Sequence, residues 1–157
     1  MKKRGILILL VTMISGVRLM AQSSIPADSA SLAAGEGKGI AAEAELNGYP
    51  APRHVLDLKD KLGLTKDQIR KAENLLKLVG ISASAKGGEI IEAEQELHQF
   101  FASGKINEKL LRAKLESIGK LRGELRFIHM QAHLKMKQIL NPDQIQQYYE
   151  SQAREIK

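Results

Sequence analysis

The sequence contains no cysteine and no tryptophan, and its aromatic side chains are limited to three phenylalanines and three tyrosines. Without cysteine the chain forms no disulfide and carries no thiol for a lipid anchor. Six aromatic rings are few for a large globular core, whereas long helices packed along their length need fewer large side chains. We therefore expect helix packing or oligomerisation to stabilise the chain.

Residue patterns typical of enzymes are also absent from the sequence. It has no HExxH motif, no glycine-rich phosphate loop after a strand, and no serine nucleophile placed with a histidine and an acid. Glu92, Glu94 and Glu96 lie close together, but alternate residues point to different sides of a helix, so we interpret them as solvated or paired with basic residues. No segment shows the alternation of a β-strand. The sequence predicts an all-α protein that is not an enzyme.

Residues 1–21 have the pattern of a secretory signal peptide. A basic cluster at 2–4 precedes an uncharged run from 5 to 17, and Ala21 is a small residue at the expected cleavage point. The apolar run is shorter than the roughly 20 residues that a spanning helix needs. We predict export with loss of this segment and no stable membrane span afterwards. An uncleaved membrane anchor is the alternative, because Arg18 is unusual so close to a cleavage site.

Cleavage would change the charge of the chain. The formal net charge of +6 comes from 24 basic and 18 acidic residues. The predicted signal peptide contains four of the basic residues and no acidic one, so the remainder has 20 basic and 18 acidic residues, a net charge of +2. This charge does not favour nucleic acid as a partner.

Residues 22–53 differ in composition from the rest of the chain. They are rich in serine, alanine and glycine, and the glycines between 35 and 39 make regular structure costly there. We predict a flexible leader, with a helical turn from Ala41 to Leu46 that Asn47 and Gly48 would end.

Residues 54–157 carry helical periodicity throughout. The pattern predicts a short helix from His54 to Leu62, a long helix that Thr65 caps, a second long helix that Asn107 caps, and a last helix after Asn141. A short turn at residues 103–106 makes the two long helices antiparallel neighbours. The predicted fold is a long bent antiparallel hairpin with short flanking helices, in which the glycines at 80, 87 and 88 would bend or break the first long helix.

Two copies of one short pattern flank this hairpin. Each reads Leu, then Thr or Asn, then two residues, then Gln; the residues are Leu64, Thr65 and Gln68 in the first copy and Leu140, Asn141, Pro142 and Gln144 in the second. Together they resemble the paired LTxxQ motifs of the Spy/CpxP family of periplasmic proteins, over about residues 54–152. The second copy departs from the family pattern in having Asn141 where threonine is usual.

The resemblance implies a bent helical hairpin that forms a homodimer with a cupped surface. It implies a periplasmic, ATP-independent chaperone or envelope-stress adaptor that needs no cofactor, with unfolded envelope proteins or a membrane sensor protein as partners. Such a protein would capture apolar and acidic segments on a dimeric cradle, for which the basic and apolar residues along both long helices are candidates. The alternative is that those residues simply form the solvated faces of the helices and bind no partner. Related members bind or sense zinc, nickel or cobalt, so a heavy-metal-binding protein is the alternative function.

The histidines are the candidate metal ligands. His129 and His133 are four residues apart and share one helix face, the spacing by which two imidazoles hold one metal ion. The antiparallel register brings His54 and Glu73 to the same level, so these four residues are the predicted site for a divalent metal such as zinc. His98 lies too far along the hairpin to join them.

Ordinary half-exposed histidines are the other interpretation of this set. In the related heavy-metal sensors, a His and Met four apart precede the second motif, and these positions fall on Ala132 and Met136 here. Alanine cannot bind a metal, so the family's ligand set does not transfer as a whole.

Overall fold

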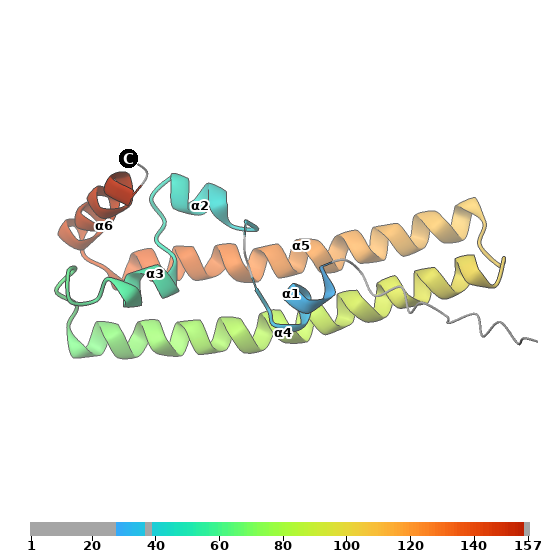
Figure 1. Cartoon of the computed structure of the whole chain (residues 1–157), viewed down its shortest axis with the longest axis horizontal. Coiled ribbons are helices and arrows are strands. Elements are labelled where there is room, and N and C mark those ends of the chain that lie inside the picture. Colours follow the sequence, from blue (N-terminus) through green and yellow to red (C-terminus); the bar gives the residue numbers. More distant parts are fainter. Residues whose placement is uncertain (1–27, 37–38, 156–157) are drawn as a thin grey trace, which may run out of the picture.

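A computed structural model describes residues 28–36 and 39–155, and within these ranges the protein is all-helical (Figure 1). The predicted signal peptide and the first residues of the predicted leader lie outside them. None of the described helices is both long and apolar enough to span a membrane.

The two longest helices form the predicted antiparallel hairpin. Helix α4 spans Lys66–Ala102 and α5 spans Glu108–Ile139, and they lie side by side in Figure 1. Gly104 adopts a positive φ of 65° in the turn between them, a conformation that glycine tolerates best. Helix α4 runs without interruption through residues 80–88, where the glycines had suggested a bend or break.

Side-chain caps begin the long helices at the predicted residues. The Thr65 hydroxyl accepts a hydrogen bond from the Gln68 amide, and the Asn107 side chain accepts one from the Leu110 amide. Each cap pairs one of the amides that the first turn of a helix leaves without a partner. The sequence therefore located both helix starts.

Two short helices close the open end of the hairpin. Helix α3 covers Pro52–Asp57, shorter than the predicted span to Leu62, and α6 covers Pro142–Glu155. Between them and the long helices lies the larger hydrophobic cluster. Its buried members are Val55, Leu62, Ala72, Leu75, Ala132, Met136, Leu140 and Tyr148.

The described part of the predicted leader packs on the hairpin instead of extending from it. It contains α1 (Ser29–Ala33) and α2 (Ala42–Leu46), the second close to the predicted helical turn. Leu32 is 5% exposed and belongs to a second hydrophobic cluster formed with both long helices. The small residues of α4 allow this packing, because a Cβ added to Gly87 would overlap the Leu32 carbonyl.

Candidate functional site

Three of the four predicted metal ligands line a single cavity. It has a volume of about 770 Å³ and lies between residues 34–54 and the middle of the hairpin. His54 approaches it from α3, and His129 and His133 approach it from adjacent turns of α5. We call this space the histidine cavity.

His129 brings a buried nitrogen without a hydrogen-bond partner to this cavity. Its Nε2 atom is buried and makes no hydrogen bond within the described structure. Burial lowers the pKa of His129, and the neighbouring His133 lowers it further. Both effects favour the neutral imidazole, in which a ring nitrogen is able to accept a hydrogen bond or bind a metal.

The other two histidines already have partners. Nδ1 of His133 lies 2.7 Å from the carbonyl oxygen of Tyr49, to which it donates a hydrogen bond. Nδ1 of His54 lies 2.7 Å from a carboxylate oxygen of Glu45, at the exposed rim of the cavity.

The predicted fourth ligand lies elsewhere. Glu73 is exposed on α4 and is not among the residues that line the cavity, although Leu76 of the next turn is. Over residues 28–36 and 39–155, no three His, Asp or Glu side chains are grouped closely enough to hold a metal ion as they stand. The histidines thus share a cavity without forming a coordination centre.

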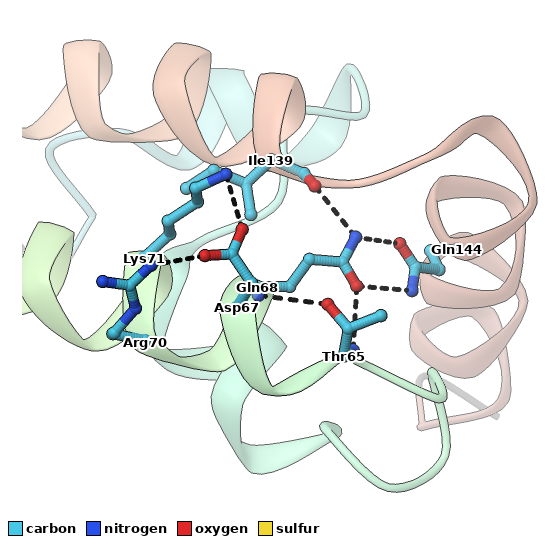
Figure 2. A network of polar contacts seen from close by, with 7 residues as sticks. All are labelled: Thr65, Asp67, Gln68, Arg70, Lys71, Ile139 and Gln144. Atoms are coloured by element: carbon cyan, nitrogen blue, oxygen red, sulfur yellow. Dashed lines mark hydrogen bonds and ion pairs between the residues drawn. The ribbon is translucent and has the colours of Figure 1, made fainter.

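The two Leu-Thr/Asn-x-x-Gln copies meet at the open end of the hairpin (Figure 2). Nε2 of Gln68 donates to Oε1 of Gln144 over 2.8 Å, and Nε2 of Gln144 donates back to Oε1 of Gln68 over 3.1 Å. Each glutamine also accepts a hydrogen bond from the backbone amide of its own N-cap residue, Thr65 or Asn141. Two capping boxes are therefore joined through their side-chain amides.

This glutamine pair also holds neighbouring backbone. Gln68 donates its second hydrogen bond to the carbonyl of Ile139, and Gln144 donates to the carbonyl of Leu62. Gln144 is only 6% exposed, so its amide depends on these partners. The sequence identified both glutamines as motif residues but did not predict that their side chains face each other. The repetition of one motif at both ends of a hairpin could have indicated this contact.

Large apolar side chains remain exposed on the outside of the hairpin. Leu78 and Ile81 of α4 are 63% and 60% exposed, and Phe127 and Leu134 of α5 are 60% and 50% exposed. Lysine and arginine side chains accompany them along both helices, including Lys77, Arg126 and Lys135. Where exposed apolar side chains gather into a contiguous patch with polar residues at its rim, they mark surfaces that contact other proteins.

Comparison with known proteins gave no relative for this chain. No family model, no curated protein and no solved structure matched it.

Proposed function

We propose that the protein binds exposed apolar segments of other proteins on the outside of its hairpin, without ATP, as a periplasmic chaperone or envelope-stress adaptor. The observation that carries the proposal is the exposure of Leu78, Ile81, Phe127 and Leu134, each at least half accessible to solvent. Burying such a side chain against a partner yields about 1.5–3 kcal/mol, so a few contacts give reversible binding.

Two further features support this proposal. The exposed apolar residues lie on long helices joined by a short turn, a rigid support that needs little ordering when a partner binds. The basic side chains beside them would attract acidic segments of an unfolded chain. The resemblance to Spy/CpxP proteins points to the same activity, and to a homodimer as the working form.

An aggregation assay tests the proposal directly. α-Lactalbumin unfolded by reduction of its disulfides is a suitable client, because the reductant does not affect a protein without cysteine. We expect the purified protein to slow the rise of light scattering, without ATP, at equal or lower molar ratio. A protein that leaves the aggregation rate unchanged would disprove the proposal.

Paired substitutions locate the binding surface. Phe127→Ser together with Leu134→Ser should weaken the protection, because the exposed apolar contacts on α5 are lost. Leu46→Ser is the control, since Leu46 is even more exposed, at 74%, but lies on α2 and not on a long helix. A control variant that loses as much protection as the α5 variant would contradict the assignment to the hairpin.

Binding of a divalent metal ion such as zinc is a second candidate function, and the unpaired Nε2 of His129 favours it. An ion bound there would take His133 as a second ligand, and His54 on release from Glu45. Calorimetric zinc titration should show binding that His129→Ala weakens about tenfold or more, as loss of one of three ligands should. His98→Ala is the control, because His98 is exposed near the turn. An affinity that His129→Ala leaves unchanged would reject this site.

A further inference from the structure

Residues 28–36, called the strap below, pack on the hairpin, and the surface that they cover is called the groove. The strap consists of α1 and the residues beside it, and Figure 1 shows α1 lying across the middle of α4. The floor of the groove is made of small residues, among them Gly80, Ala83 and Gly87. A Cβ at Gly87 would overlap the Leu32 carbonyl, so the two backbones touch and any side chain there would prevent the contact.

One side chain anchors the strap. Leu32 enters the second hydrophobic cluster, where its buried neighbours are Ala83, Ile90 and Leu125. Partly buried side chains surround this set: Ile40, Ile91, Leu121 and Ile128. Release of the strap would therefore expose a ready-made apolar site formed by both long helices.

The polar attachments of the strap are few and close to solvent. The hydroxyl of Ser84 donates to the carbonyl of Ala33 over 2.7 Å. The guanidinium of Arg122 donates to Asp28 over 2.8 Å and to Glu94 over 2.9 Å. Exposed ion pairs contribute little to stability, and a helix of five residues is not stable by itself. The burial of Leu32 is therefore the main attachment of the strap.

We propose that the strap is an internal occupant of a peptide-binding groove, and that the groove accepts segments of other proteins with the same chemistry. The fitting segment has one leucine-sized apolar residue among alanine, serine or glycine, with an acidic residue on its N-terminal side. The leucine replaces Leu32, and the acid pairs with Arg122. This inference rests on the proposed function and adds to it a second, covered binding site with its own specificity.

The small residues of the strap explain that specificity. Between Asp28 and Glu36 the strap contains only serine, alanine, leucine and glycine. Gly35 has a φ of +64°, and a Cβ there would lie 2.7 Å from the backbone nitrogen of Ser84. A segment with large residues beside its leucine would not approach the glycine floor closely enough to bury that leucine.

A labelled peptide with the strap sequence, Asp-Ser-Ala-Ser-Leu-Ala-Ala-Gly-Glu, serves as the probe. In the unaltered protein the strap competes with it at high effective concentration, so binding measured by fluorescence anisotropy should be weak. Leu32→Asp removes the anchor and leaves the groove intact, so the peptide should bind about tenfold or more tightly. Equal affinity for both proteins would overturn the proposal.

Two neighbouring glycines supply a matched test of the groove. In the Leu32→Asp background, Gly87→Ala puts a methyl group where the peptide backbone must lie and should abolish peptide binding. Gly88→Ala in the same background should leave binding unchanged, because nothing lies within 4 Å of a Cβ at Gly88. Loss of binding in both variants, or in neither, would contradict the assigned groove.

A second variant that releases the strap keeps the test valid if the Leu32→Asp protein misfolds. In Gly35→Val the new side chain would collide with the α4 backbone at Ser84 and displace the strap. The substitution changes no residue of the groove itself. It should increase peptide binding as Leu32→Asp does, with an unchanged helical circular dichroism spectrum; unchanged binding would overturn the proposal.

The client assay separates this inference from the proposed function. If the unaltered protein slows aggregation but neither strap variant binds the peptide, the strap inference fails and the proposed function stands. If no variant slows aggregation, the proposed function fails, whatever the peptide does.

Discussion

Replacement of Gln68 by leucine tests whether the glutamine pair holds the open end of the hairpin together. The side chain makes four hydrogen bonds: one from the Thr65 amide, one to the Ile139 carbonyl and two with the amide of Gln144. Each such bond contributes about 1 kcal/mol net, and polar groups left buried without partners add to the loss. We expect Gln68→Leu to lower the free energy of unfolding by about 3 kcal/mol.

Urea unfolding followed by circular dichroism at 222 nm measures this change. Gln138→Leu is the control, because Gln138 is an exposed glutamine of α5 and its replacement should change the stability by about 0.5 kcal/mol or less. A loss of less than about 1 kcal/mol for Gln68→Leu, similar to the control, would refute the reasoning.

The double variant separates pairing from simple loss of polar groups. Gln144→Leu alone should also be costly, because it leaves the Gln68 amide and the Leu62 carbonyl without their partner. With both glutamines replaced, neither side chain is left unpaired, so the cost should be below the sum of the single changes by about 1–2 kcal/mol. Additive costs would show that the two side chains act independently.

Three other measurements follow from the structure. The pKa of His129 is lowered on folding, so below about pH 6.5 the unfolded chain binds a proton more readily than the folded chain. The free energy of unfolding should therefore fall as the pH is lowered from about 7 to 5. Urea unfolding at each pH measures this dependence, and His129→Gln should reduce it. Gly87→Ala should lower the thermal midpoint of unfolding, because the added methyl group displaces Leu32 from its buried position. Gly88→Ala should raise the midpoint slightly, because alanine has the higher helix propensity. Calorimetry compares the two variants, and equal shifts would contradict the contact between Gly87 and Leu32. Asn107→Ala should cost about 1 kcal/mol in urea unfolding because it removes the N-cap of α5, and Asn107→Asp, which preserves the cap, should cost little.

The sequence located the long helices because their signals are local. Thr65 and Asn107 cap the helices that they were predicted to cap, and the short turn predicted the antiparallel arrangement. The packing of residues 28–53 was not predictable in the same way. Leu32 is a single apolar residue in a serine- and alanine-rich stretch, and its counterpart Gly87 lies far along the chain, so no periodic pattern records the contact.

The candidate site was predictable in part for a related reason. Hairpin register and the turn at Gly63 placed His54, His129 and His133 at one level, and the structure has all three around one cavity. Glu73 was predicted at the same level, but it is exposed on α4 and does not line the cavity. The unpaired state of the His129 Nε2 depends on side-chain packing, for which the sequence holds no direct signal.

The distribution of buried residues divides the hairpin into a fixed end and a compliant end. The buried residues of α4 stop at Ile90, and those of α5 begin at Ile118. Between these two residues and the turn at Gly104, the helices are held together by partly buried side chains and by the ion pair of Lys114 with Glu96. The glutamine pair and the larger cluster fix the opposite end. Local unfolding of the hairpin should therefore cost least beside the turn, where the fewest buried residues hold the two helices.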